Sequence, residues 1–214
     1  HLLNLCLLGG LIGACASSPE ATERWTATAS TDPITGVERC VVSIPDRRFG
    51  SSFSRTGAIY PFVEKNSELG LLVGVSSGGK IRLPTGDIEW RVDDNPHHTL
   101  RASDTPSPSI GIPGFNTSGM NQATLKAFEK SMADSAGMIF SVQNGVTAVG
   151  GDKATKLLAE MRIGKELRFR SKTAVPSAGL ASASTYRTGR IENGELVPFL
   201  LDGSFERALA DCGL

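Results

Sequence analysis

Two histidines follow two carboxylates in the middle of the chain, where His97 and His98 come after Asp93, Asp94 and Pro96. Imidazole and carboxylate side chains bind zinc and carry out general acid–base catalysis. Adjacent residues of an extended strand point to opposite faces, so His97 and His98 cannot bind one metal ion together. Aspartate and proline at this spacing are also typical of turns. We interpret the stretch as a turn, and we predict no metal ion, no cofactor and no catalytic residue.

Two other stretches come close to known motifs without completing them. Residues 116 to 119, Asn-Thr-Ser-Gly, lack the first glycine of the GxSxG elbow of serine hydrolases. Residues 78 to 80, Gly-Gly-Lys, lack the spacing of a phosphate-binding loop, and Lys80 is followed by Ile81 instead of Ser or Thr. We interpret residues 78 to 80 as a hairpin turn. Because catalytic residues distant in sequence can converge in a fold, a hydrolase is the alternative to a protein that acts by binding.

Covalent modification of Cys15 is the chemistry that the sequence indicates most directly. Residues 12 to 15, Ile-Gly-Ala-Cys, resemble the bacterial lipobox: a branched aliphatic residue, two small residues and the cysteine that becomes the lipidated first residue of the mature protein. Only a thiol at that position can accept a diacylglyceryl group as a thioether. The alternative is that Cys15 ends an ordinary signal peptide or a short buried helix and stays a plain thiol.

The residues before Cys15 support a targeting role. Apart from His1, residues 1 to 14 contain no acidic or basic side chain, whereas all 22 basic and 22 acidic residues lie beyond Cys15. This apolar run is shorter than the roughly 20 residues of a transmembrane helix and suits a signal peptide, whose basic start we expect to be missing here. Residues 15-24 then form a lipidated tether. We expect acyl chains on Cys15 to hold the protein at the periplasmic face of a bacterial membrane, the outer membrane by preference.

Export also changes what is expected of the other cysteines. Of the four cysteines, Cys6 lies in the signal and Cys15 would be acylated, which leaves Cys40 and Cys212 as a pair. An oxidising compartment favours a disulfide between them, and closing so long a loop stabilises the fold by about 4 to 5 kcal/mol in the chain-entropy model. The alternative is two separate buried thiols.

Length and charge limit the classes of protein that need to be considered. Residues 25-214 are enough for one domain with its own core. The formal net charge is zero, without the basic surplus that nucleic-acid-binding proteins carry, and we therefore predict no nucleic-acid partner.

Alternation of apolar and polar residues predicts mainly strands. We expect a hairpin from residues 25–30 and 37–44, and further strands at 69–75, 87–93, 138–143, 167–171, 185–191 and 196–201. Within 87–93, Ile88, Trp90 and Val92 share one face, and Glu89, Arg91 and Asp93 share the other. The aromatic side chains of Trp25, Trp90 and Tyr186 are expected in the core, with a ligand groove as the alternative.

Helical periodicity is scarcer. We predict a helix that Asp152 caps and Gly164 ends, with Ala154, Leu157, Leu158 and Met161 on one face, and two others at 121–136 and 204–211. The fold class is therefore mainly β: an antiparallel sandwich or barrel-like domain with two or three packed short helices. Residues 101-121 form a Pro- and Gly-rich loop, either an excursion between two halves of the fold or a flap over a ligand.

Four stretches carry a wider resemblance: Trp25 followed by Cys40, then residues 71 to 96, 161 to 170 and 197 to 213. In order and pattern they resemble the invasion-associated locus B family of exported bacterial proteins, over most of residues 25 to 213. The resemblance implies a small, exported, β-rich domain with a role in host-cell contact or in the envelope, and it implies no catalytic residues. This chain differs from the family pattern in having two cysteines in the mature domain, in its lipobox and in its Pro-rich stretch.

We therefore expect an exported, lipid-anchored envelope protein that acts by binding or structural interaction. Its partners would be the membrane, through Cys15, and an envelope or host protein. The alternatives are an envelope hydrolase and a subunit that adds a strand to a partner's sheet, which requires a long exposed strand with a free edge.

Overall fold

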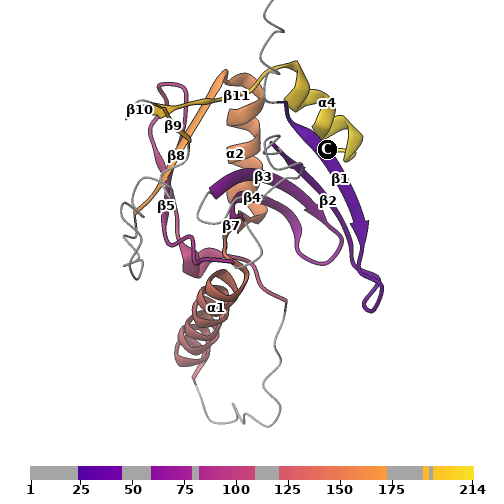
Figure 1. Ribbon diagram of the computed structural model, residues 1–214. Helices are drawn as coiled ribbons and strands as arrows, with labels where there is room; N and C mark the ends of the chain where they lie inside the picture. The colour runs from indigo at the N-terminus through magenta and orange to yellow at the C-terminus, as the bar shows by residue number, and fades with distance from the viewer. Residues whose placement is uncertain (1–23, 45–58, 79–81, 109–120, 173–189, 193–194) are drawn as a thin grey trace, which may run out of the picture.

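The computed structural model describes residues 24–44, 59–78, 82–108, 121–172, 190–192 and 195–214. In these ranges the chain forms two antiparallel sheets that share a hydrophobic core with two helices, while a third helix projects from the body (Figure 1). The predicted β-rich fold with antiparallel sheets and packed helices is confirmed. Of the two architectures left open, the described strands form separate sheets and close no barrel.

The larger sheet has five strands, and every neighbouring pair in it is antiparallel. In spatial order they are β1 (Thr26–Thr31), β2 (Glu38–Ser43), β3 (Ile59–Asn66), β4 (Gly70–Ser77) and β7 (Val146–Gly150). β1 and β2 are the predicted first hairpin. Its turn forms because the amides of Ile34 and Thr35 both donate to the Asp32 carboxylate, at 2.8 Å.

The smaller sheet has four strands in the order β11, β8, β5 and β6, again antiparallel. Their bounds are β5 (Ile88–Val92), β6 (His98–Leu100), β8 (Glu166–Ser171) and β11 (Phe199–Leu200). β9 (Arg190–Glu192) and β10 (Glu195–Val197) form a separate two-stranded ribbon.

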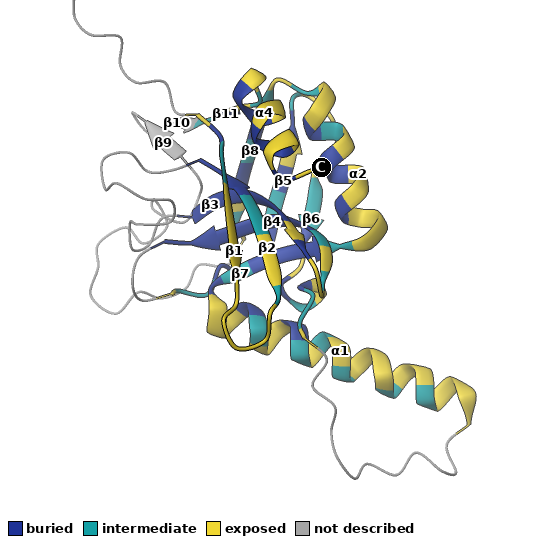
Figure 2. Ribbon diagram, turned by 90° about the vertical axis from the view of Figure 1, so that its right-hand side faces the viewer, coloured by how far each residue is buried: buried dark blue, intermediate teal, exposed yellow. Residues whose placement is uncertain are grey.

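The helices differ in how far they pack onto the sheets. α2 (Gly151–Ile163) and α4 (Gly203–Asp211) lie against the body, whereas α1 (Gln122–Asn144) extends away from it (Figure 2). A short 3-10 helix, η2 (Ala102–Asp104), contacts both α1 and β7. In the part of the chain that the structure describes, no helix has the length and apolar character needed to cross a membrane.

One row of valines shows how the core is built. Val42, Val63, Val73 and Val149 face one another across β2, β3, β4 and β7, and each is at most 1% exposed. β-branched side chains pack well on a pleated sheet, so this row forms the inner face of the larger sheet.

The smaller sheet and α2 pack against the valine row with the side chains that the sequence pattern predicted to be buried. From the smaller sheet come Ile88, Trp90 and Val92, all fully buried. From α2 come the four predicted core residues, all buried: Ala154, Leu157, Leu158 and Met161. Burying side chains of this size stabilises the fold by about 1.5 to 3 kcal/mol each.

Two predictions about local structure are wrong. Residues 138–143 are not a strand but the last turns of α1, where Gly137 and Ser141, four residues apart, pack on one face and Gly145 ends the helix at φ 59. The apolar alternation there is compatible with a strand, and the continuing helix overrides it. The other is the hairpin turn at residues 78 to 80. Residues 79 and 80 lie outside the described residues, but β4 before them and β5 after them belong to different sheets and therefore form no hairpin.

Smaller differences concern the ends of elements. The cap of α2 is Gly150 and not Asp152, which lies in the first turn instead. The strand predicted at 196–201 is split into β10 and β11 at Pro198, which has no N–H to donate to a ladder. β3, β6 and β7 were not predicted at all. Of the strand predicted at 185–191, residues 185–189 lie outside the described residues.

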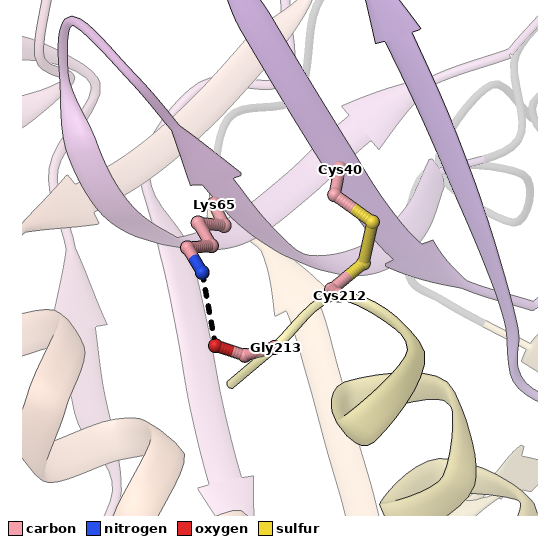
Figure 3. Close-up of a disulfide and its surroundings, with 4 residues drawn as sticks. All are labelled: Cys40, Lys65, Cys212 and Gly213. Atoms are coloured by element: carbon pink, nitrogen blue, oxygen red, sulfur yellow. Dashed lines mark hydrogen bonds between the residues drawn. A yellow bond between two sulfur atoms is a disulfide. The ribbon is translucent and has the colours of Figure 1, made fainter.

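The C-terminal helix joins the two ends of the domain. Cys212, just after α4, forms a disulfide with Cys40 on β2, as the sequence predicted (Figure 3). Lys65 Nζ on β3 donates to the carbonyl of Gly213 at 3.0 Å. The Trp25 ring packs on the Phe205 ring with 4.8 Å between centroids. These contacts fix α4 over the inner face of β1 and β2.

We expect the replacement of Cys212 by serine to lower the free energy of unfolding by about 5 kcal/mol, because Cys40 and Cys212 are 172 residues apart in the sequence and the bridge restricts the unfolded chain. Urea unfolding of the oxidised protein at neutral pH measures this loss. The control is the Cys40→Ser/Cys212→Ser variant, which should be no less stable than the single variant. Equal stability of Cys212→Ser and the unaltered protein would contradict the prediction.

Candidate functional site

The structure separates the two histidines: His98 links β6 to α2, and His97 does not take part in this link. His97 is exposed, while His98 Nε2 lies 2.9 and 3.0 Å from the two carboxylate oxygens of Glu160 on α2. Glu160 therefore connects α2 to β6. Among the described residues no serine or cysteine hydrogen-bonds to His98, and no group of His, Cys, Asp or Glu could hold a metal ion.

Asp93 confirms the interpretation of this stretch as a turn. It is the one described non-glycine residue with a positive φ, 49°, and its carboxylate accepts hydrogen bonds from the amides of Lys165 and Glu166 at 2.8 to 3.1 Å. Aspartate tolerates this left-handed conformation better than most residues. The turn therefore fixes the end of β5 to the start of β8.

The tryptophans belong to the core, as predicted. Trp25 is 3% exposed and Trp90 is fully buried. The Trp25 indole N–H donates to the carbonyl of Leu200 at 2.7 Å, which links the start of β1 to β11. Tyr186 lies outside the described residues, as do Cys6 and Cys15.

A groove of about 600 Å³ lies on the outer face of the larger sheet, the face turned away from the valine row. The hairpin turn between β1 and β2 borders it with Asp32, Thr35 and Val37. Thr105, Pro106 and Pro108, which follow η2, and Phe140, Gln143 and Asn144 at the end of α1 also line it. Concave sites of this size are the usual places where proteins bind small molecules or chain segments.

The floor of the groove is largely apolar. Phe62, Leu72 and Ala148 form a small buried cluster on this face, and Val41, Leu69 and Val146 pack against it. Phe62, Gly74 and Ala148 lie opposite one another on β3, β4 and β7. A Cβ at Gly74 would lie 2.1 Å from the Thr147 oxygen, so only glycine lets β4 and β7 approach this closely.

An ion pair with a buried carboxylate and a half-exposed guanidinium interrupts this apolar floor. Arg39 on β2 donates to both carboxylate oxygens of Glu64 on β3, Nε at 2.7 Å and one terminal nitrogen at 2.8 Å. Asn66 Nδ2 donates to the same carboxylate at 2.8 Å. The Glu64 side chain is 5% exposed and that of Arg39 is 51% exposed, so the carboxylate is buried and the guanidinium faces the groove.

The chemistry of this pair suits recognition. The hydrogen bonds to Glu64 raise the pKa of Arg39 above its usual value, so the guanidinium keeps its charge over the whole working range of pH. A guanidinium has five N–H donors, and Glu64 takes two of them. Arg39 can therefore donate to a ligand while Glu64 holds it in place, and Phe62 and Leu72 offer apolar contact beside it.

Part of the Pro- and Gly-rich stretch contributes to the groove. Thr105 is buried, and its Oγ1 accepts a hydrogen bond from the Ala148 amide at 3.3 Å, so the stretch covers the outer edge of β7 before Pro106 and Pro108 reach the groove. Residues 109–120 lie outside the described residues. The described part is thus both a connection between elements and a wall of the groove.

Sequence reasoning missed this site. Arg39 lies in a predicted strand, and alternation places it on the opposite face from Cys40, but β3, which carries Glu64, was not predicted. The signal that could have indicated β3 is the spacing of Tyr60, Phe62 and Glu64, which occupy every second position and therefore share one face of a strand. Their alternation is obscured by Pro61 and by apolar residues on the other face.

We expect Arg39→Gln to cost more stability than Glu64→Gln, about 2 to 4 kcal/mol against about 1 to 2, because the first leaves a buried carboxylate without its cation and the second leaves a half-exposed guanidinium that water can solvate. Urea unfolding of both variants at neutral pH measures the two losses.

The matched control is the double variant Arg39→Gln/Glu64→Gln, which should be more stable than Arg39→Gln alone, since it contains no unpaired buried charge. The same loss for both single variants would show that burial of Glu64 does not govern the energetics of the pair.

Comparisons with known proteins identify no relative of this chain. No protein-family model, no curated protein and no solved structure matches the chain. The resemblance to the invasion-associated locus B family stays an expectation from sequence pattern, and the groove is the feature on which a function can be argued.

Proposed function

We propose that this chain is an exported bacterial envelope lipoprotein, anchored through Cys15, that binds a segment of a partner protein in the groove on the outer face of its larger sheet. The observation that carries the proposal is the combination of an apolar floor with a fixed, half-exposed Arg39. Pockets that are mostly apolar and contain a few fixed polar groups are typical of binding sites.

The shape and chemistry of the groove favour an amphipathic segment. Val41 and Leu69, both partly buried, can contact an apolar side chain of a ligand. Arg39 can donate to a backbone carbonyl or a carboxylate, and Gln143 at the end of α1 supplies both a donor and an acceptor. A segment of an envelope or host protein offers both kinds of group.

The expected location is supported by cysteine chemistry. The Cys40–Cys212 disulfide is consistent with an oxidising compartment outside the cytoplasm. The lipobox at residues 12 to 15 supplies the anchor in this proposal. The acyl chains would attach the protein to the membrane surface. A role in host-cell contact rests on the family resemblance alone.

Binding is the function that we prefer to hydrolysis. A hydrolase would use His98 and Glu160 as base and carboxylate, yet in the described part of the chain both oxygens of Glu160 are directed at the imidazole and no nucleophile accompanies them.

A photo-crosslinking amino acid at Val37, which lines the groove, should form an adduct with the partner in intact envelopes. The matched control is the same amino acid at Ile163, which is 83% exposed at the end of α2 and does not line the groove. Adding Val41→Glu to the Val37 probe should lower the yield several-fold, because it places a charge in the apolar floor. Equal adducts from both positions would rule the groove out as the binding site.

Lipidation has its own test. In cells grown with labelled palmitate, the protein should carry label and Cys15→Ser should carry none, since a hydroxyl cannot form the thioether. Cys6→Ser is the control and should be labelled as the unaltered protein is. Label that persists in Cys15→Ser would exclude the anchor without affecting the proposal for the groove.

A further inference from the structure

The edges of the two sheets are protected very unequally. In the smaller sheet the edge strands β6 and β11 are only three and two residues long. In the larger sheet the edge of β7 is covered by η2 and Thr105. β1 is six residues long, and within the described residues it pairs with β2 alone (Figure 2). Sheet edges are normally shortened, covered or charged, because an open edge pairs with other chains.

The sequence of β1 has none of the features that discourage pairing. Thr26 to Thr31 reads Thr-Ala-Thr-Ala-Ser-Thr, without a charge, a proline or a glycine, and its last four residues are exposed. Threonine is among the residues that favour strands. β1 is therefore suited to accept another strand.

The hairpin hydrogen bonds show which backbone groups face the open edge. The Asp32 amide donates to the Val37 carbonyl at 2.9 Å, so Asp32 and Val37 lie in the phase of the hydrogen-bonded pairs of this hairpin. Such pairs alternate along an antiparallel ladder, and the register therefore directs the backbone groups of every second residue toward β2. The groups that point away from β2 belong to Ala27, Ala29 and Thr31. The amide of Trp25, two residues before Ala27, also points away from β2 and donates to Ser204 Oγ at 3.0 Å.

The alternation of these backbone groups allows a register in which β1 of one copy pairs with β1 of a second copy. When two β1 strands run antiparallel with a two-fold axis at Thr28, Ala27 of one copy lies opposite Ala29 of the other, and the backbone groups of both point away from their own β2. Thr26 lies opposite Ser30, and Thr28 opposite Thr28, so hydroxyl side chains meet on the outer face.

Charge complementarity also favours a second copy. In the same register Arg24, exposed just before β1, lies opposite Asp32 of the other copy at both ends of the paired strands. The amides of Thr35 and Ile34 lower the pKa of Asp32, so its carboxylate is charged at neutral pH. Opposite charges on facing residues of an antiparallel pair stabilise it.

We propose that β1 is a dimerisation edge, at which two copies of this chain pair antiparallel about Thr28 and join their five-stranded sheets into one continuous sheet. The two-fold axis is perpendicular to the sheet, so both outer-face grooves open on the same side of the dimer. This inference does not depend on what the grooves bind.

The register gives a test that no other surface would pass. Thr28 faces its own copy across the axis, so Thr28→Lys and Thr28→Glu each place like charges opposite each other, and each should weaken the dimer about tenfold or more. An equimolar mixture of the two should form the Lys–Glu heterodimer. Native mass spectrometry of the purified full chain over a range of concentrations distinguishes the three species by mass.

Ser30 provides the matched control, because it faces Thr26 of the other copy and not itself. Ser30→Lys and Ser30→Glu should therefore dimerise nearly as the unaltered chain does, without preference for the mixture. Ala29→Pro should abolish dimerisation and keep the β1–β2 hairpin, because the N–H that it removes points away from β2. Far-UV circular dichroism and an intact Cys40–Cys212 bridge show that this variant has folded.

A chain that stays monomeric at all concentrations would overturn the proposal, as would a dimer that tolerates Thr28→Lys and Thr28→Glu equally. Binding of a foreign strand at β1 without self-association would leave the edge as a docking site but refute the second copy as its occupant.

Discussion

The attachment of the C-terminal helix to the first hairpin is the constraint on which the other features depend. The Trp25 ring packs at a tilt against the Phe205 ring, the Trp25 indole N–H donates to the Leu200 carbonyl, and Cys40 is bridged to Cys212. Residues far apart in the sequence are thus fixed side by side, and the disulfide lowers the entropy that the unfolded chain would gain. Because α4 covers the inner face of β1 and β2, the outer face and the edge of this hairpin are the parts that the described residues leave uncovered.

The two faces of the larger sheet carry different side chains because they have different neighbours. The inner face meets α2 and the smaller sheet, so it needs apolar side chains of matched volume, and the row from Val42 to Val149 supplies them. The outer face meets no second sheet among the described elements. It can therefore include a polar group such as the Arg39–Glu64 pair, provided that every buried atom of Glu64 finds a donor.

Groove and edge are adjacent features of the same sheet. The β1–β2 turn borders the groove, and β1 itself is the free edge, so pairing of two copies at Thr28 would stiffen a wall of each groove without covering its floor. Two grooves on one face of a dimer would raise the avidity for a partner with repeated segments. In these proposals the uncharged β1 strand contacts a second copy, and the fixed guanidinium of Arg39 contacts the ligand in the groove.

The sequence by itself determined the elements whose periodicity is unambiguous, and it predicted the pairing of the cysteines only through the expectation of export. Ile88, Trp90 and Val92 alternate with charged residues, and the core side of α2 repeats at helical spacing, so local pattern alone indicates which side is buried. Once export was assumed, counting left Cys40 and Cys212 as the only pair. Pattern failed where it was ambiguous, as at residues 138–143 and at β3, whose residues are buried on both faces.

The tertiary structure alone decided the groove, the His98–Glu160 link and the exposed edge. Arg39 and Glu64 are 25 residues apart, and their contact exists only because β2 and β3 pair in one register. Whether a strand lies at an edge depends on which strands find partners, and no property of Thr26 to Thr31 specifies that. Contacts between distant segments follow from the packing of whole layers, which local propensity does not encode.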